Sequence, residues 1–255
     1  MIAGLALTIF VNGAAAAAQV PGAGTTAPST DENIISVGEQ LELRHVALTT
    51  ESLIAALKNP DAVVRALAAG KLREDSMVDG NDLKGAIPAL AAALAAEKEP
   101  DAKIHMATAL AGLGDVRGST VLAHMCYDRD LGNRVRLEAA DFLLSVGSQE
   151  CHDAVVSIAM LGEPIEKAGA FNVLQRFRQL SPRKRVSDVE IMCRGLTDAN
   201  VNVREAAGNA LGFFGEQSAI QCLRDAITHE PKDYVRLVMQ GSIDRLESEA
   251  KRPRK

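Results

Sequence analysis

The sequence contains very few aromatic residues and no tryptophan. Phe, Tyr and Trp make up 3 % of the 255 residues, whereas hydrophobic residues of all kinds make up 47 %. Strands favour aromatic and β-branched side chains, so this composition argues against a β-sandwich. A core of alanine, leucine, valine and isoleucine suits closely packed helices, because small side chains let helix axes approach one another. The composition therefore favours an all-α protein.

Several chemical motifs are also missing. The four cysteines form no CxxC pair, which argues against a zinc ribbon and a thioredoxin-type site. There is no GxSxG sequence and no glycine-rich phosphate loop. The net charge of −5 does not favour a general binder of nucleic acids or other polyanions. We therefore expect a protein that is not an enzyme, with no catalytic residue, no cofactor, no metal and no nucleic-acid partner.

The N-terminal residues carry no charge. The apolar run Ile2–Val11 has the length of the hydrophobic region of a signal peptide, and Ala14–Ala18 supplies the small residues that precede a cleavage site. A membrane span needs roughly 20 apolar residues, so we predict a cleaved signal peptide at residues 1–18, no permanent span, and export to the periplasm or the exterior. The first basic residue is Arg44, which leaves an uncleaved anchor or a disordered alanine-rich tail as alternatives. Without a signal the protein would be cytoplasmic.

The composition also divides the rest of the chain. Residues 19–33 are rich in Pro, Gly, Ser and Thr and are typical of a flexible linker. We expect a linker and lead-in at residues 19–48, a folded domain at residues 49–248, and a disordered basic tail at residues 249–255.

A repeated pattern organises the folded domain, and it is clearest in Leu196–Gly215, LTDANVNVREAAGNALGFFG. An apolar helix end is followed by a turn with Asp198, by Val203-Arg204, and by a helix of small residues. Variants recur every 30 to 40 residues, with the arginine position at residues 65, 105, 136, 166, 204 and 236. Two helices per unit at this period are typical of an α-solenoid. We predict a right-handed α-solenoid of about six antiparallel helical hairpins.

The pattern resembles the HEAT-repeat family, in particular the short repeats first noted in phycobilisome lyases, over about residues 50–247. The resemblance implies a non-enzymatic scaffold that binds a protein or peptide on a concave face formed by the second helices. Two alternatives belong to other classes. One is a lyase-type or accessory protein that acts on a cofactor-bearing protein, and the other is a structural component of a cell-envelope assembly.

The turn in most repeats carries an acidic residue six positions before the arginine. Such an acid can accept hydrogen bonds from backbone N–H groups and can pair with an arginine of its own or the adjacent repeat. This predicts a structural ladder along the stack, interrupted in the fourth repeat, where Met160 and Glu166 replace both partners. The predicted ladder residues are Asn59, Arg65, Glu99, His105, Asp130, Arg136, Asp198, Arg204, Glu230 and Arg236.

Two connections are longer than the others, namely Glu74–Gly85 and Arg176–Asp188. Loops at the edge of a solenoid are frequent sites of function, and the second connection holds the densest basic cluster. A solvated loop is the alternative interpretation of that cluster. The predicted protein-binding residues are Lys71, Arg73, Arg178, Arg183, Lys184 and Arg185.

The cysteines and histidines leave two interpretations open. If the third and fourth repeats stack in register, His124 and Cys126 would converge with Cys151 and His152 on a zinc or copper site. In an oxidising compartment the pairs Cys126–Cys151 and Cys193–Cys222 could instead form disulfides.

The lone His229-Glu230 pair invites comparison with deoxyhypusine hydroxylases, a HEAT-like family that carries iron-binding His-Glu pairs just after the arginine position. Here the pair lies in a turn. The resemblance therefore does not extend to an iron site.

Overall fold

The computed structural model describes residues 35–78, 83–177 and 182–251, without the side chains of residues 182–185. These residues form thirteen α-helices and one short 3-10 helix, and they contain no strand. Within the described ranges, no helix is both long and apolar enough to span a bilayer. The predicted signal peptide lies outside the described residues.

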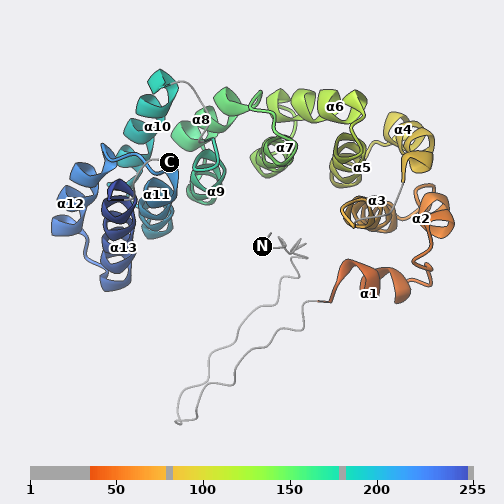
Figure 1. Cartoon of the computed structure of the whole chain (residues 1–255), viewed down its shortest axis with the longest axis horizontal. Helices are drawn as coiled ribbons and strands as arrows, with labels where there is room; N and C mark the ends of the chain where they lie inside the picture. The colour runs from red at the N-terminus through yellow and green to blue at the C-terminus, as the bar shows by residue number, and fades with distance from the viewer. Residues whose placement is uncertain (1–34, 79–82, 178–181, 252–255) are drawn as a thin grey trace, which may run out of the picture.

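Twelve of the helices form six successive hairpins, as the repeat pattern predicted. Figure 1 shows the first helix of each hairpin on the outside of an arc and the second helix on the inside. The hairpins are α2 (Thr50–Ala56) with α3 (Ala62–Ser76), α4 (Ile87–Ala96) with α5 (Pro100–Gly112), α6 (Val116–Tyr127) with α7 (Asn133–Ser145), α8 (His152–Leu161) with α9 (Pro164–Leu174), α10 (Pro182–Gly195) with α11 (Val201–Phe214), and α12 (Ala219–His229) with α13 (Asp233–Ala250). The chain is an α-solenoid.

A further helix, α1 (Val37–Glu42), closes the N-terminal end and lies inside the segment that was predicted as linker. Ser36 caps it, accepting a hydrogen bond from the Glu39 backbone N–H while the Glu39 carboxylate accepts one from the Ser36 N–H. Val37 and Leu41 are buried, and α1 packs on α3. Two buried apolar residues are too few to give a clear helical period, which is why the sequence of this lead-in did not distinguish a short helix from an extended segment.

The last helix, α13, closes the other end with polar side chains. Gln240 and Asp244 are exposed, and the Gln240 side chain donates a hydrogen bond of 2.8 Å to the Asp244 carboxylate. Arg236 contacts the Glu230 carbonyl and the Asp233 carboxylate of its own repeat. A polar terminal repeat is what a solenoid needs where stacking stops.

Small residues allow the inner helices to pack closely. A Cβ atom built at Gly212 of α11 would lie 2.5 Å from the Ser242 Oγ of α13, closer than real contacts allow. Larger side chains fill the space between layers, and Phe171, Phe177 and Phe214 are the largest fully buried ones. Gly114, Gly147 and Gly215 end α5, α7 and α11 with φ of 82°, 85° and 83°, the left-handed conformation that favours glycine.

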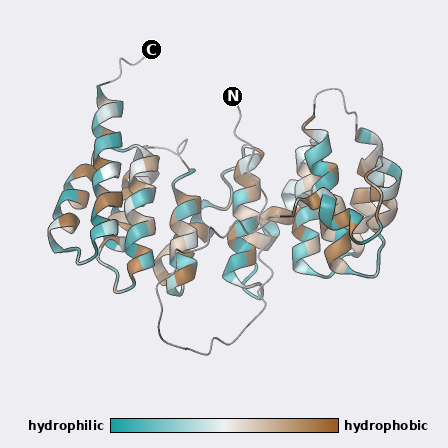
Figure 2. Ribbon diagram, turned by 90° about the horizontal axis from the view of Figure 1, so that it is seen from below, coloured by the Kyte–Doolittle hydropathy of each residue, from teal (hydrophilic) through white to brown (hydrophobic). Residues whose placement is uncertain are grey.

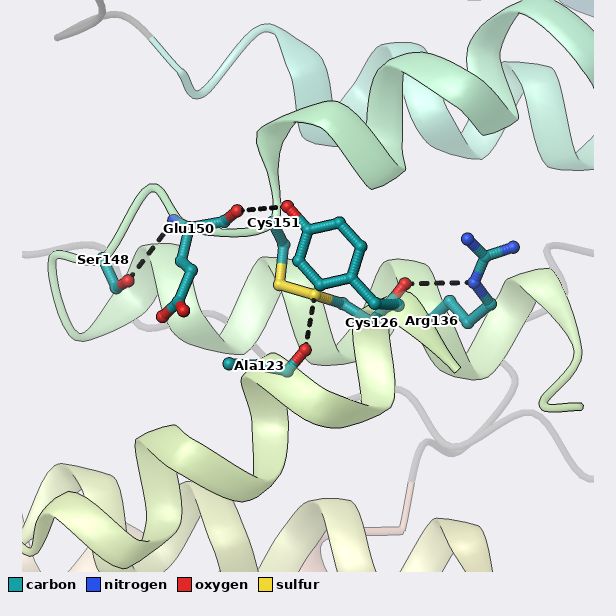
Figure 3. Close-up of a disulfide and its surroundings, with 7 residues drawn as sticks. Ala123, Cys126, Arg136, Ser148, Glu150 and Cys151 are labelled. Atoms are coloured by element: carbon teal, nitrogen blue, oxygen red, sulfur yellow. Dashed lines mark hydrogen bonds between the residues drawn. A yellow bond between two sulfur atoms is a disulfide. The ribbon is translucent and has the colours of Figure 1, made fainter. Parts of the chain in front are cut away.

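Both disulfides form, and each joins one repeat to the next in the outer layer. Cys126 of α6 pairs with Cys151, the residue before α8, with Cα atoms 6.1 Å apart (Figure 3). Cys193 of α10 pairs with Cys222 of α12, with Cα atoms 5.9 Å apart. All four cysteines are therefore used in cross-links between neighbouring repeats.

Candidate interaction surface

The left-handed glycines give the structural register of the repeats. Gly114, Gly147 and Gly215 follow Lys103, Arg136 and Arg204 at the same spacing. Lys103, rather than the predicted His105, therefore occupies the arginine position of the second repeat. The predicted alignment missed this because the second repeat has Ile104-His105 where repeats one, three, five and six have Val-Arg.

The fourth repeat has no such glycine, but a buried phenylalanine gives its register. Phe177 and Phe214 are both fully buried, and they follow Lys167 and Arg204 at the same spacing. Lys167, rather than Glu166, therefore holds the arginine position of the fourth repeat.

The turn acids cap the turn that ends each first helix. In five repeats a side-chain oxygen accepts a hydrogen bond of 2.9–3.0 Å from the backbone N–H two residues later. The accepting residues are Asn59, Glu97, Asp128, Asp198 and Glu230. Glu97 and Asp128 thus take the role predicted for Glu99 and Asp130, because the residue that closes the turn is the one at the helix end.

Two ladder pairs have the same geometry at opposite ends of the stack. Arg65 donates to both carboxylate oxygens of Glu97 at 2.6 and 2.8 Å, and Arg204 donates to both oxygens of Glu230 at 2.6 and 3.0 Å. Each pair links one repeat to the next. The guanidinium beside Glu97 lowers the pKa of that carboxyl to about 2, and Arg204 lowers the pKa of Glu230 in the same way.

The arginines of these pairs also donate hydrogen bonds to backbone carbonyls in the turn that follows the preceding helix. The Arg65 Nη1 donates to the carbonyls of Asn59 and Pro60 at 2.8 and 2.9 Å, and the Arg204 Nη1 donates to the carbonyls of Asp198 and Ala199 at 3.0 Å each. Asn59 and Asp198 therefore meet the arginine of their own repeat through the backbone. The ladder residues hold the stack together and are occupied in doing so.

In the centre of the ladder, other residues replace the arginine–glutamate pairs. Lys167 donates to Asp198 at 3.1 Å, which links the fourth repeat to the fifth. Between the third and fourth repeats, the Asn133 side chain accepts from Arg136 at 2.7 Å and donates to Glu166 at 2.9 Å. The fourth repeat thus keeps its links to both neighbours, although Gly162, which has no side chain to cap the turn, ends α8.

His105 lies inside the stack rather than on the ladder. Burial lowers the pKa of its imidazole to about 4, so the ring is neutral at pH 7, and the ring centre lies 6.0 Å from that of Phe142. The link between α5 and α7 on the exposed side is the ion pair of Arg134 with Asp101, at 2.6 Å.

The predicted binding residues that the structure describes are engaged within the protein. Lys71 forms an ion pair of 2.8 Å with Asp75, and the Arg73 guanidinium lies 5.8 Å from the centre of the Phe142 ring. Arg178 lies outside the described residues, as do the side chains of Arg183, Lys184 and Arg185. The backbone places these last three in the first turn of α10 rather than in a loop.

The connection Arg176–Asp188 also contributes buried residues to the core, namely Phe177 and Asp188. Phe177 is fully buried and packs its ring edge-on against His152, with ring centres 5.1 Å apart. The His152 Nε2 lies 2.9 Å from the buried Asp188 carboxylate, which ties α8 to α10. Phe177 is therefore not available to stack with a ligand.

The cysteine and histidine cluster of the third and fourth repeats is occupied by a disulfide. Because Cys126 and Cys151 are bonded to each other, neither supplies a thiolate for a metal. Beside the bond, the Tyr127 hydroxyl donates to the Glu150 carbonyl at 2.6 Å, and the Arg136 Nε donates to the Cys126 carbonyl at 3.0 Å (Figure 3). The described residues contain no group of three or more His, Cys, Asp or Glu side chains that could hold a metal ion.

Two positions in each inner helix place their residues on the concave face of the arc. Glu205 and Asn209 lie on the side of α11 opposite its buried residues, and α11 lies on the inside of the arc. Figure 2 shows the inner helices from the open side of the arc. The equivalent pairs, from the first repeat to the sixth, are Ala66 and Gly70, Ile104 and Thr108, Leu137 and Asp141, Ala168 and Asn172, Glu205 and Asn209, and Leu237 and Gly241.

These equivalent positions are covered at one end of the molecule and open at the other. Ile104 is 0 % exposed, whereas Leu237 is 72 % exposed. Both positions are buried in repeats one and two, one of the two is buried in repeat three, and neither is buried in repeats four to six. Both concave positions are therefore accessible only over α9, α11 and α13, and we call this accessible part of the concave face the groove.

The side chains around this groove differ from those of the covered half. Ile165 at its α9 edge is 83 % exposed, and Tyr234 and Phe213 are about half exposed. The Arg245 guanidinium stacks on Phe213, 3.7 Å from the ring centre. By contrast, exposed charges on α5 and α7 are paired within the protein. Arg134 forms ion pairs with Asp101 and with Glu138, and Asp141 forms one with Arg176.

The hairpins, the ladder and the covered ends define a helical-repeat protein. Residues 157–243, which lie within repeats four to six, match the family model of HEAT repeats. A comparison with curated protein sequences gave no match.

Solved structures with similar folds include human deoxyhypusine hydroxylase in complex with glycerol, at 17 % identity and a TM-score of 0.41, covering 84 % of this chain and 93 % of that one. Two engineered proteins align at 18 % and 16 % identity with TM-scores of 0.48 and 0.49, each over 78 % of this chain and over 96 % and 99 % of theirs.

Proposed function

We propose that the protein is a non-enzymatic scaffold that binds another protein or a peptide in the groove over repeats four to six. The observation that supports this is the change in exposure along equivalent positions, from buried Ile104 to exposed Leu237. An apolar residue that is exposed at a position buried elsewhere in the same repeat indicates a surface that a partner can cover.

The two alternative functions have weaker support. A cofactor-dependent accessory protein would be favoured by converging cysteines and histidines, but Cys126 and Cys151 form a disulfide. A structural unit that stacks end to end would be favoured by an apolar outer face on α13 around residues 238–246, but there the helix exposes the polar side chains of Gln240 and Asp244.

The export prediction belongs to the same proposal. Disulfides persist in oxidising compartments and are rare in the cytosol. Both cysteine pairs lie within bonding geometry and use every cysteine of the chain. We propose that the protein matures and acts outside the cytosol. N-terminal sequencing of the mature protein, expected to begin at Gln19, tests this; an intact Met1 on a cytosolic protein would contradict it.

Photo-crosslinking tests the binding proposal. A benzophenone amino acid at Asn209, on the groove, should yield a discrete crosslinked partner when the protein is made in its native host. The matched control carries the same amino acid at Glu190, an exposed position on the outer helix α10. Equal crosslinking from both positions, or none from Asn209, would contradict the proposal.

A further inference from the structure

The groove contains a carboxylate, Glu205, that no described residue pairs with a cation. Glu205 lies on the concave side of α11, half-buried between the inner helices of the fourth and sixth repeats. The described residues give it no ion pair and no side-chain hydrogen bond, whereas Asp141, Asp198 and Glu230 are each paired with a cation. A carboxylate at the centre of a recessed face favours a cationic partner group.

Two side-chain amides occupy the same position in neighbouring repeats. Asn172 of α9 and Asn209 of α11 are equivalent in register, and both are accessible. Neither side chain makes a hydrogen bond within the described part of the chain. An amide both donates and accepts, so the pair matches the exposed N–H and C=O groups of an extended main chain. A helical partner would offer little here, because its backbone groups are already paired.

Apolar side chains stand at both sides of Glu205. Ile165 borders the groove at α9, and Tyr234 and Leu237 border it at α13. Adjacent inner helices pack about 8–10 Å apart, so the open face spans roughly 16–20 Å from α9 to α13. An extended chain advances about 3.3 Å per residue, so about five or six residues cross it.

We propose that the groove binds an extended peptide segment in which a Lys or Arg that contacts Glu205 is flanked by apolar residues that contact Ile165 on one side and Leu237 with Tyr234 on the other. This inference rests on the proposed scaffold function and specifies its partner. The free main-chain groups of the segment pair with Asn172 and Asn209.

The test uses the full, oxidised protein and fluorescein-labelled hexapeptides. The probe has the sequence Ser-Leu-Lys-Val-Leu-Ser, a second peptide replaces its lysine by glutamate, and a third replaces both leucines by serine. Fluorescence anisotropy should show the lysine peptide binding at least about tenfold more tightly than the glutamate peptide, and the serine peptide binding more weakly than the lysine peptide.

Variants locate the binding. Glu205→Lys should reverse the preference, so that the glutamate peptide binds better, while the matched change Glu190→Lys on the outer surface leaves it unaltered. Asn209→Ala should weaken binding about fivefold. Gly241→Trp should abolish binding by filling the groove, because a Cβ at Gly241 meets nothing within 4 Å and the change leaves the fold intact; Gly241→Ala should bind as the unmodified protein does.

The outcomes separate this inference from the scaffold proposal. A preference that Glu205→Lys leaves unchanged would overturn the inference. If no peptide binds while Asn209 still crosslinks to a partner, the scaffold proposal stands and the extended basic segment is wrong. Peptide binding that survives Gly241→Trp would place the site elsewhere and would count against both.

Discussion

The first three repeats and the last three are built from the same hairpin, yet only the last three present an open inner face. Ile104 in the second repeat and Glu205 in the fifth occupy equivalent positions, one fully buried and the other accessible. In the first half a side chain reaches across the concave side, because the Arg73 guanidinium of α3 lies 5.8 Å from the centre of the Phe142 ring on α7. A position in this repeat therefore belongs to the core or to the surface according to local packing.

The outer helices of the two halves differ in their covalent links. Both disulfides lie between repeats three and six, and the described residues of the first two repeats contain none. Cys126–Cys151 joins the third repeat to the fourth, and Cys193–Cys222 joins the fifth to the sixth.

The largest expected effect concerns the ladder, which is the same in both halves. Arg204→Ala leaves the buried Glu230 carboxylate without its cation and should lower the free energy of unfolding by about 3–5 kcal/mol. Arg65→Ala should have a similar effect through Glu97. Urea unfolding followed by circular dichroism measures both, and a loss below about 1 kcal/mol in either would show that the ladder does not stabilise the stack.

The Cys193–Cys222 disulfide should stabilise the second half of the stack. Replacing Cys193 and Cys222 together by alanine should cost about 3 kcal/mol, because the bond closes a separation of 29 residues. Limited proteolysis of this variant should cut first within repeats five and six. If cleavage began in repeats one and two, the assignment of the weaker half would be wrong.

A matched pair of substitutions tests the comparison directly. Ile104→Ala removes a fully buried side chain and should cost roughly 2–4 kcal/mol. Leu237→Ala, at the equivalent position of the sixth repeat, should change stability by less than about 0.5 kcal/mol. Denaturant titration of both variants gives the two values, and equal losses would remove the distinction between the halves.

A smaller effect depends on pH. His105 has a folded-state pKa of about 4, below its ordinary value of 6.5, because burial disfavours the charged ring. As the pH falls below 6.5 the unfolded chain takes up a proton that the folded protein does not, so stability should decrease by roughly 2 kcal/mol between pH 7 and pH 5. His105→Gln should remove this part of the pH dependence. An unchanged slope in the variant would show that the ring is not held neutral by burial.

The periodic pattern of small and apolar residues was enough to predict the solenoid and its six hairpins. The ladder register was predicted less well, because Ile104-His105 resembles the Val-Arg dipeptide and conceals Lys103. The spacing to Gly114 was a readable signal for the correct register. The open groove could not be predicted, since Ile104 and Leu237 have the same character in sequence. They differ in their surroundings, because α5 has an inner helix on each side and α13 ends the stack.

Carbene footprinting of the oxidised protein, read by mass spectrometry, tests the central claim most directly. Photolysis of a small diazirine labels accessible side chains regardless of their chemistry. Labelling should be strong at Ile165 and Leu237 on the open face and close to background at Ile104 and Leu137 in the covered half. Comparable labelling at all four positions would contradict the account, because the groove would then not be confined to the last three repeats.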